Sequence, residues 1–360
     1  MKRFWFLLPR RPVALVSLIV LGLLYLGMIF CEFLAPYGPN DQFQNHSDQP
    51  PNFSLWSQAL GFRPQVQTMA MLNDITRKYA RVSGEYTSVT FLAVGPAVKL
   101  WRLFPINRHL FGTAFYADQS GSAQPVFLFG SDNLGRDIFS RILYGARISL
   151  TIGFVGVAIS LSLALVLGGL AGYFGGAWDW ITMRICEFII LVPGLYLILF
   201  LRSILSNNMT SGQSYALITV ILSFVGWPGT ARMIRGMVHA VKRNDFVANA
   251  QLESMPPLPI LFRHIIPQIS SILIVSVTLG VPGFILGETV LSYLGLGIVD
   301  PAVSWGSMIS RDATTISNLV SFPWLFTPGI FLLLVALSFN FLGELLRDAL
   351  DPNWRERRRE

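Results

Sequence analysis

Long runs of apolar residues with almost no charge dominate the pattern of the chain. A helix that crosses the roughly 30 Å hydrocarbon layer of a bilayer needs about 18 or more such residues. Six stretches meet or approach this length, and they predict six transmembrane helices in an all-α polytopic membrane protein: Val13–Ala35, Ile148–Phe174, Ile185–Leu201, Tyr215–Ala231, Ile269–Leu294 and Trp324–Leu346. The third stretch is the least regular, because Glu187 and Pro193 interrupt it and Arg202 ends it.

The composition agrees with a chain that lies mostly in lipid. Of its 360 residues, 52% are hydrophobic and only 13% are charged. Soluble domains carry roughly 25% charged residues, so the composition argues against a soluble protein. The two cysteines, Cys31 and Cys186, lie in separate apolar stretches. Neither a disulfide framework nor a cysteine-rich zinc cluster is therefore expected.

Basic residues gather in three segments that are predicted to be cytoplasmic. Short loops with many lysines and arginines stay on the cytoplasmic side of a membrane. The N-terminus (1–12), the loop 236–268 and the tail 347–360 have this character, whereas the loop Ser203–Ser214 has no basic residue and Ile298–Pro323 has only Arg311. Both termini are then cytoplasmic, as six spans require. The first apolar run is longer than that of a signal peptide and is interpreted as a retained anchor.

A long polar segment separates the first two spans. Residues 36–128 are too long for a connector, and long translocated loops escape the charge rule, so we expect them outside the cytoplasm. Tyr37–Gln58 is rich in Pro, Asn, Asp and Gln and indicates a loop. Between Tyr86 and Phe111, Thr, Val, Phe and Trp mixed with glycine and proline suggest short strands and turns. A small extracytoplasmic subdomain is the favoured interpretation, and an irregular excursion on the membrane face is the alternative.

The sequence lacks the common motifs of hydrolases and nucleotide-binding proteins. Its four histidines form no H-E-x-x-H pair, and it has neither a G-x-S-x-G elbow nor a G-x-x-x-x-G-K-[ST] loop. The chain is therefore not expected to be an enzyme or to bind a metal ion or cofactor. Any energy from ATP would have to come from another subunit.

The basic loop contains a predicted short helix. Residues Phe246–Gln268 read FVANAQLESMPPLPILFRHIIPQ, in which Pro256 and Pro257 follow a helical pattern. Proline has no N–H group and pushes the residue before it out of the α conformation, so the helix should run from Asp245 to about Met255. Its shape suits docking to another protein. An ordinary amphipathic loop at the inner membrane surface is the alternative.

This loop is the first of four segments that resemble the membrane-spanning subunits of ATP-binding-cassette importers, in the dipeptide, oligopeptide and nickel branch. It resembles the family's coupling segment, E-A-A, three residues, G, nine residues, I-x-L-P, with Ala248 in place of the acid and Ser254 in place of the glycine. The resemblance implies an ATPase-coupling loop whose contact residues are Asp245, Phe246, Ala248, Asn249, Ala250, Glu253, Ser254, Arg263 and Pro267. Because the usual acid is missing, we expect docking to depend more on shape and on Asp245 or Glu253.

The second segment is the most specific of the four. Phe129–Leu150 reads FGSDNLGRDIFSRILYGARISL and closely resembles the entry to the second span in this branch. We predict an interfacial segment at 129–147, in which Asp137 and Arg141 are i,i+4 partners. Its charged motif residues are Asp132, Arg136, Asp137, Arg141 and Arg147. A charged surface helix that only anchors the span is the alternative to substrate contact.

The third segment, Gly287–Gly306, resembles the fifth span and the re-entrant turn after it, and the fourth, Ser338–Asn353, resembles the closing signature of the branch. Glu288 lies inside a span, where ionisable residues usually face the bundle interior or a water-filled path. Glu288 and, less clearly, Glu187 are therefore pathway candidates, with a buried structural carboxyl as the alternative for Glu288. Gly295 and Gly297 should allow a tight turn on either side of Leu296.

Together these segments imply a permease subunit of an ATP-driven importer, with its transmembrane core at 148–346, in the cell membrane of a prokaryote. The implied partners are a homologous permease subunit, two cytoplasmic ATP-binding subunits that hold the ATP and an extracytoplasmic solute-binding protein, but no nucleic acid. Peptides are the favoured substrate class, and nickel chelates or other solutes remain open. The alternatives are an ion-gradient-driven transporter or channel subunit, and a membrane scaffold without transport.

Overall fold

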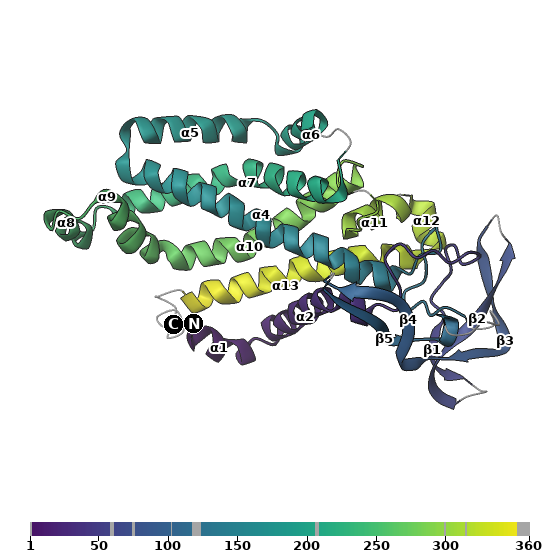
Figure 1. Cartoon of the computed structure of the whole chain (residues 1–360). Helices are drawn as coiled ribbons and strands as arrows, with labels where there is room; N and C mark the ends of the chain where they lie inside the picture. Colours follow the sequence, from purple (N-terminus) through teal and green to yellow (C-terminus); the bar gives the residue numbers. More distant parts are fainter. Residues whose placement is uncertain are drawn as a thin grey trace. The chain divides into compact units, whose positions relative to one another are not determined.

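The computed structural model describes residues 2–57, 61–73, 76–101, 103–116, 124–205, 209–298, 300–313 and 315–350. The chain divides into two compact units. The first comprises Met1–Leu21, Thr151–Leu291 and Leu334–Glu360, and the second comprises Gly22–Leu150 and Ser292–Leu333. Among the described residues, the first unit contains helices and no strand, whereas the strands all belong to the second (Figure 1).

The helices that lie in the first unit, wholly or in part, are α1 (Lys2–Leu7), η1 (Leu8–Arg10), α2 (Pro12–Ile29), α4 (Ile138–Phe174), α5 (Gly176–Leu191), α6 (Gly194–Leu205), α7 (Ser211–Val241), α8 (Asp245–Leu252), α9 (Pro257–Pro259), η3 (Ile260–Ile265), α10 (Ile266–Tyr293) and α13 (Thr327–Leu350). Those of the second unit alone are α3 (Cys31–Leu34), η2 (Ala114–Tyr116), α11 (Trp305–Asp312), α12 (Ile316–Ser321) and η4 (Pro323–Phe326). The fold is therefore mostly helical, as the apolar pattern predicts.

Five helical stretches of the described residues are long and apolar enough to cross a membrane: Pro12–Ile29, Ile138–Phe174, Ser211–Val241, Pro257–Tyr293 and Pro323–Leu350. The predicted span Ile185–Leu201 is not one straight helix, because it covers parts of α5 and α6, which form a pair bent by 92°. Whether this pair crosses the membrane as a sixth span stays a prediction. Val192, directly before Pro193, is extended (φ −78°, ψ 125°), which is the conformation that a following proline favours. The number of candidate spans is therefore five, or six if the bent pair counts as one.

The boundaries of several spans also differ from the prediction. α2 ends at Ile29, six residues before the predicted Ala35. α4 begins at Ile138, ten residues before the predicted span, so residues 138–147 belong to the long helix and do not form a separate interfacial helix. α7 continues to Val241 and contains Pro228, and it begins with a capping box in which Thr210 and Gln213 bond to each other's backbone N–H groups. Hydropathy alone places the ends of these spans too early or too late, because polar residues with tertiary partners can extend a helix.

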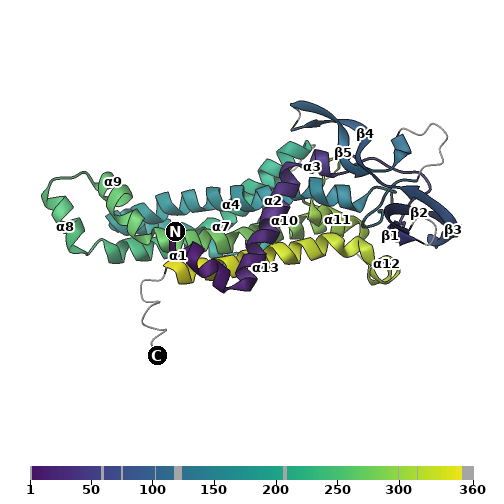
Figure 2. The ribbon, with the colours of Figure 1, turned by 90° about the horizontal axis from the view of Figure 1, so that it is seen from below.

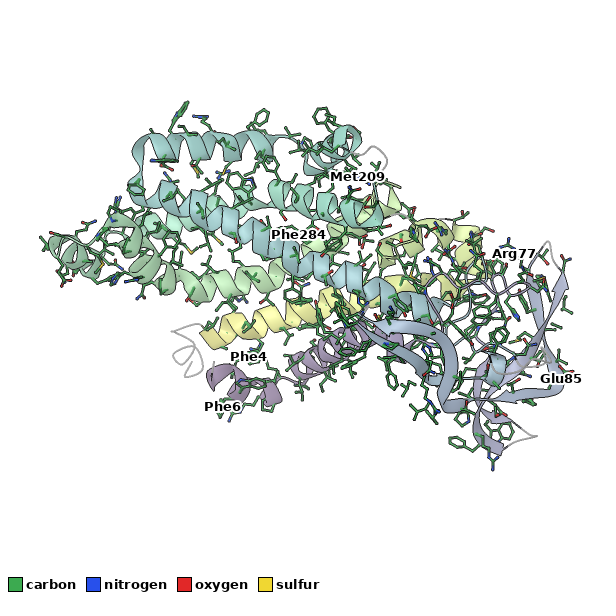
Figure 3. The ribbon with its side chains drawn as sticks, in the orientation of Figure 1. Phe4, Phe6, Arg77, Glu85, Met209 and Phe284 are labelled. Carbon is green, nitrogen blue, oxygen red and sulfur yellow. The ribbon has the colours of Figure 1, made fainter. Side chains whose placement is uncertain are left out.

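A buried apolar cluster holds the helices of the first unit together. It includes residues from α4, α5, α7, α8, η3 and α10: Ala164, Cys186, Ile234, Val247, Leu261 and Ile269. α4 and α7 pack backbone to backbone, since a Cβ atom on Gly168 would lie 2.4 Å from the carbonyl oxygen of Ala231. Small residues allow such close approach of membrane helices. Phe284 of α10, labelled in Figure 3, packs against Gly156 of α4, where a Cβ atom would lie 2.4 Å from its ring.

The second unit contains two antiparallel sheets from the segment after α2. One has the order β1–β2–β3 and the other is the β4–β5 hairpin, with strands β1 (Phe53–Ser57), β2 (Gly61–Asn73), β3 (Lys78–Ser88), β4 (Thr90–Leu100) and β5 (Phe104–Gly112). Strands between Tyr86 and Phe111 agree with the prediction, although they are longer than expected. β1 lies inside the predicted loop Tyr37–Gln58, which is a difference. A small aromatic core of Tyr37, Phe43 and Phe127 packs beside Val66 and Val126.

The segment after α10 turns sharply at two glycines. Gly295 has φ +76°, and a Cβ atom on Gly297 would lie 2.0 Å from Ser292 Oγ. The predicted tight turn on either side of Leu296 is therefore confirmed. The chain then enters α11, where the buried Trp305 donates its backbone N–H to Ser149 Oγ (3.1 Å) and its indole N–H to the carbonyl oxygen of Ile142 (3.0 Å).

Candidate functional site

The candidate coupling element is α8, in the first unit. Figures 1 and 2 both place it beyond the ends of α7 and α10. Val247 and Ala250, three residues apart on one face, are buried in the apolar cluster. The opposite face carries Ala248, Asn249 and Leu252, which are exposed, and the side chain of Leu252 is 83% exposed. One face of α8 is thus anchored to the helices, and the other is free to bind a partner.

α8 ends three residues before the predicted Met255, and Ser254 explains the difference. Ser254 has φ +59°. Its N–H donates to the carbonyl oxygen of Gln251 (3.0 Å), and the N–H of Met255 donates to the carbonyl oxygen of Ala250 (3.1 Å). These bonds form a Schellman motif, in which the left-handed residue is usually glycine. Ser254 stands where the coupling pattern of the family has its glycine. The chain therefore keeps the turn without the residue that adopts it most easily.

The second half of the coupling loop leads back into the helices. Ile260–Ile265 forms a π-helical segment that ends two residues before Pro267, which has no N–H group for a regular helical hydrogen bond. Leu261 and Ile265 of this segment are buried, whereas its Arg263 and Pro267 of α10 are exposed. Since α8 and this segment both pack on the apolar cluster, the structure brings the two halves of the predicted coupling loop together.

Two polar contacts brace the helices next to α8. Arg235 of α7 donates to both carboxylate oxygens of Asp179 on α5, at 2.8 and 2.5 Å. Lys242, at the end of α7, donates to the carbonyl oxygen of Tyr173 on α4. Sequence reasoning missed Asp179. Its signal was an acid in the first turn of a helix, where the helix dipole favours negative charge.

The two pathway candidates differ in their surroundings. Glu288 of α10 is fully buried. Glu187 of α5 is partly exposed and forms an ion pair with Arg184 on the same helix (2.7 Å). A cavity of about 180 Å³ lies in the first unit. Its lining is mostly apolar and includes Ser160, Thr230 and Ser276 from three helices. The burial of Glu288 is compatible with a pathway or a structural role, so its function stays a prediction, as does that of Glu187.

Four of the five charged motif residues, all in the second unit, are buried within the protein. Their predicted position at the membrane interface stays a prediction. Arg136 donates from Nε to Asp132 Oδ2 (2.6 Å), and Arg141 lies 3.6 Å from the same oxygen and donates to the carbonyl oxygen of Pro39 (2.9 Å). Asp137 accepts hydrogen bonds from the N–H and hydroxyl groups of Ser140 and so caps α4. The predicted Asp137–Arg141 pair is therefore wrong. The alternative of a charged surface helix is also wrong, because all four charged groups are almost fully buried.

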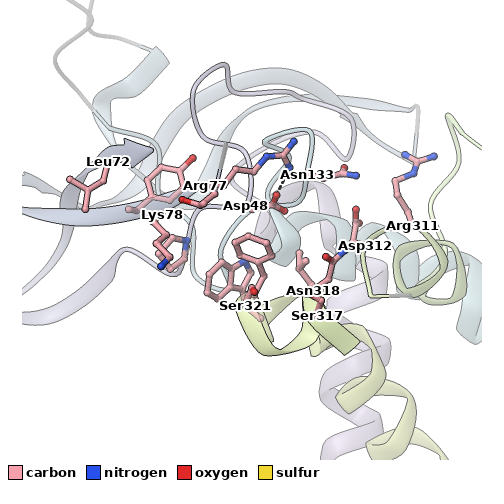
Figure 4. A pocket seen from close by; sticks show the side chains of 16 residues that line it. Asp48, Leu72, Arg77, Lys78, Asn133, Arg311, Asp312, Ser317, Asn318 and Ser321 are labelled. Atoms are coloured by element: carbon pink, nitrogen blue, oxygen red, sulfur yellow. Dashed lines mark hydrogen bonds and ion pairs between the residues drawn. The ribbon is translucent and has the colours of Figure 1, made fainter. Parts of the chain in front are cut away.

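Burial raises the pKa values of two acids in this region. Desolvation raises the pKa of Asp137 to about 7, although the hydrogen bonds from Ser140 oppose the shift. Desolvation and the charge of Asp132 raise the pKa of Asp312 to about 7, against the lowering effect of nearby arginines. Asp312, which sequence reasoning missed, lines a pocket of about 860 Å³ together with Asn133, Arg311 and the ion pair of Asp48 and Arg77 (Figure 4).

Arg147 is the last residue of the charged motif, and its partner is Glu32. Its guanidinium donates to both carboxylate oxygens, at 2.8 and 2.9 Å, and lies 4.2 Å from the ring centroid of Trp101. Burial opposes ionisation of Glu32, but hydrogen bonds from Arg147 and Trp101 lower its pKa overall. Glu32 is not among the residues that the sequence analysis predicts for a site. Among the described residues, no group of three or more His, Cys, Asp or Glu side chains could hold a metal ion.

These features agree with what comparison with known proteins finds. Residues 164–356 match the family of binding-protein-dependent transport system inner membrane components. Residues 1–51 match the N-terminal transmembrane domain of oligopeptide transport permease C. Since the first match covers more than half of the chain, the chain belongs to this family. It is therefore a multi-pass membrane protein and a permease subunit of an ATP-binding-cassette importer.

Several curated relatives are similar over most of their length. The oligopeptide transport system permease protein OppC of Haemophilus influenzae is 39% identical over 299 residues, which cover 80% of this chain and 90% of the relative. The protein of the same name from Bacillus subtilis is 38% identical, over 63% of this chain and 72% of the relative. The dipeptide transport system permease protein DppC of Bacillus subtilis is 39% identical, over 63% and 69%.

Proposed function

We propose that this chain forms half of the translocation pathway of a peptide importer and that α8 is its coupling element. The names of the relatives, which are oligopeptide and dipeptide permeases, support peptides as the substrate class. The complete importer contains a homologous permease subunit, two cytoplasmic ATPase subunits and an extracytoplasmic solute-binding protein. This chain binds no cofactor, and ATP is bound and hydrolysed on the partner subunits.

The two faces of α8 carry this proposal. An isolated helix of eight residues is marginal in water, so packing must hold it in place. Val247 and Ala250 anchor it in the same cluster as residues of α4, α5, α7 and α10. Protein interiors are close-packed and transmit strain. A displacement of the exposed face by a partner is therefore passed to the membrane helices as a movement of the whole helix.

The proposed mechanism follows from this movement of α8 as a rigid helix. ATP binding closes the two ATPase subunits, which move α8 and open the bundle towards the solute-binding protein. Hydrolysis and release then return α8 and reset the pathway. Asp245 and Glu253, at the two ends of α8, supply negative charge near the position of the missing family acid. Glu288 lines the pathway or braces the helices around it.

The proposed orientation places both termini and α8 in the cytoplasm. The short-loop charge rule supports this, since the N-terminus, the coupling loop and the tail are all basic. Arg11, directly before α2, forms an ion pair with Asp348 near the end of α13 (2.6 Å), so these two helix ends lie together within the first unit. Figure 1 also draws α8 towards the end of the first unit at which α1 and the end of α13 lie.

A proline in α8 tests the coupling. We expect Gln251→Pro to break the last turn of α8, because proline cannot donate to the carbonyl oxygen of Val247 and its ring clashes there. In proteoliposomes with all subunits, ATP hydrolysis should continue, while peptide uptake per ATP should fall by roughly tenfold, as expected for the loss of about 1.4 kcal/mol of coupling. Gln251→Ala, which keeps the helix, is the matched control and should transport normally.

Unchanged uptake per ATP in an assembled Gln251→Pro importer would show that α8 is not the lever. The substrate class is tested separately in the wild-type importer, by comparing uptake of labelled di- and oligopeptides with that of a nickel chelate. Membership of the family disfavours a gradient-driven transporter. Uptake driven by an ion gradient in vesicles that lack the ATPase subunits would revive that alternative.

A further inference from the structure

The β4–β5 hairpin of the second unit exposes large apolar side chains at its tip. The two strands pair from Thr90 and Gly112 to Leu100 and Phe104, so the tip lies beyond the last pair. Leu103 is 73% exposed and Phe104 is 65% exposed. Scattered apolar residues on a surface are ordinary, but a group of them at the end of one hairpin indicates a contact with something apolar.

Three polar contacts fix this hairpin along the end of the first span. His109 Nδ1 lies 2.6 Å from the carbonyl oxygen of Ala35, beyond the span. The backbone N–H of Trp101 donates to Glu32 (3.2 Å), and its indole N–H donates to the carbonyl oxygen of Ile29 (3.0 Å). Ile29 is the last residue of α2. The hairpin therefore runs back along α3 towards α2, and Trp101 near its tip lies beside the end of α2.

A groove of about 580 Å³ lies between the hairpin and the end of the span. Its lining is almost entirely hydrocarbon, and includes Leu23, Leu26, Phe30, Phe33, Leu100 and Ile106. Leu23 and Leu26 also belong to the exposed apolar surface of α2, which faces lipid in a transmembrane helix. The groove is thus continuous with the surface that contacts the bilayer. Figure 2 shows β4 and β5 beside α3, which follows α2.

The chemistry of the groove favours a lipid over another protein helix. Interfaces between membrane helices are enriched in small residues that let the backbones approach. Here bulky leucine and phenylalanine side chains line the groove, with Gly27 as its small residue. Tryptophan is enriched at the membrane–water interface, where its ring is apolar and its N–H is polar. Lys99 is exposed two residues before Trp101 and can contact a lipid phosphate.

We propose that the tip of the β4–β5 hairpin inserts into the bilayer interface and that the groove behind it holds an acyl chain of a phospholipid. The hairpin is then held by the bilayer as well as by α2 and α3. Trp101 lies at the headgroup level, and Leu103 and Phe104 lie at the boundary of the acyl chains. This inference concerns a lipid ligand and is independent of the transported substrate.

Spin-label accessibility tests the inserted tip. The full chain, with the subunits that co-purify with it, is placed in phosphatidylethanolamine and phosphatidylglycerol nanodiscs, carrying Leu103→Cys or the control Leu72→Cys. Leu72 is also apolar and 70% exposed, but it lines the polar pocket on the other sheet. The native cysteines are buried, and labelled wild type gives the background. We expect oxygen accessibility relative to a water-soluble nickel chelate to be several-fold higher at Leu103 than at Leu72.

Two results would overturn the inserted tip: equal ratios at the two positions, which would place it in water, or protection from both reagents, which would place it against a protein. Native mass spectrometry tests the groove. Protein released from the nanodiscs should retain a phospholipid, and Ile106→Asp should lose it, whereas Leu72→Asp should not. Equal retention by both variants would mean that the groove does not bind the lipid.

Discussion

Ser254 adopts a backbone conformation that usually belongs to glycine. Its φ of +59° costs a residue with a Cβ atom about 1 kcal/mol or more. We therefore predict that Ser254→Gly raises the free energy of unfolding by about 1 kcal/mol, because the Schellman turn is kept and the strain is removed. Thermal or denaturant unfolding in detergent measures this change.

The matched control is a glycine inside α8. Ala248 is exposed in the middle of the helix, where Ala248→Gly should lower the free energy of unfolding by about 1 kcal/mol. The same new residue, six positions apart, should thus act in opposite directions. If both variants lowered stability alike, Ser254 would not hold the left-handed conformation.

The raised pKa of Asp312 should make the stability of the folded protein depend on pH. Its carboxyl has a pKa of about 7 in the folded protein, raised by burial, against an ordinary value of 3.8. Between these values the folded protein binds a proton that the unfolded chain has lost, so this group makes stability fall as the pH rises from about 4 to about 7. Asp312→Asn removes this pH-dependent loss of stability, because asparagine does not ionise. Its stability relative to wild type should therefore be greater at pH 8 than at pH 5.

Unfolding measurements at these two pH values test the assignment, with Asp300→Asn as the control. Asp300 is exposed and forms an ion pair with the neighbouring Arg311. It should show little of this pH-dependent gain. A difference between Asp312→Asn and wild type that stays constant across the range would contradict the raised pKa of Asp312.

Residue-level predictions succeeded where the reason was local. The turn at Gly295 and Gly297 follows from backbone geometry that the sequence reveals. The partners of Asp137 and Arg141 could not be found in the same way, because i,i+4 spacing says only that two residues are near. Arg141 instead pairs with Asp132 and with the backbone of Pro39, which is about a hundred residues earlier in the chain.

At the scale of elements, the two faces of α8 should respond differently to truncation. Val247→Ala removes buried carbon from the apolar cluster and should lower the free energy of unfolding by about 1–2 kcal/mol. Leu252→Ala removes an exposed side chain and should change stability by less than about 0.5 kcal/mol. We expect Leu252→Ala instead to weaken co-purification of the ATPase subunits.

Unfolding curves and pull-down of the assembled importer separate these effects. A large loss of stability in Leu252→Ala, with normal ATPase binding, would mean that its face is not a docking surface. If Val247→Ala kept both its stability and its binding to the ATPase subunits, α8 would not be anchored through Val247.

Long apolar elements were predictable because the bilayer requires them, and the sequence also marks an interruption at Pro193, but not the angle of the bend there. The composition of Ile185–Leu201 satisfies a span, yet the break at Pro193 turns the chain by 92°. The early start of α4 depends on Asp137 as a cap and on partners for Arg141 and Arg147 in distant segments. Such partners are tertiary, so a window along the sequence cannot detect them.

At the scale of the whole molecule, family membership defines a transporter subunit, and the proposed coupling adds one requirement. The exposed face of α8 must lie on the side of the membrane where the ATPase subunits are. On the same proposal, the segment that carries β1–β5 must lie on the other side, where a solute-binding protein would deliver its cargo. The basic loop 236–268 and the long polar segment 36–128 favour this arrangement through the charge rule.

Labelling from each side of the membrane tests this arrangement most directly. Asn249→Cys places a thiol on the exposed face of α8, and Leu72→Cys places one on the exposed surface of β2. An impermeant maleimide should label Leu72→Cys in spheroplasts, whereas it should label Asn249→Cys only in inverted membrane vesicles. If both thiols reacted from the same side of the membrane, α8 could not contact the ATPase subunits as proposed, and the coupling proposal would be wrong.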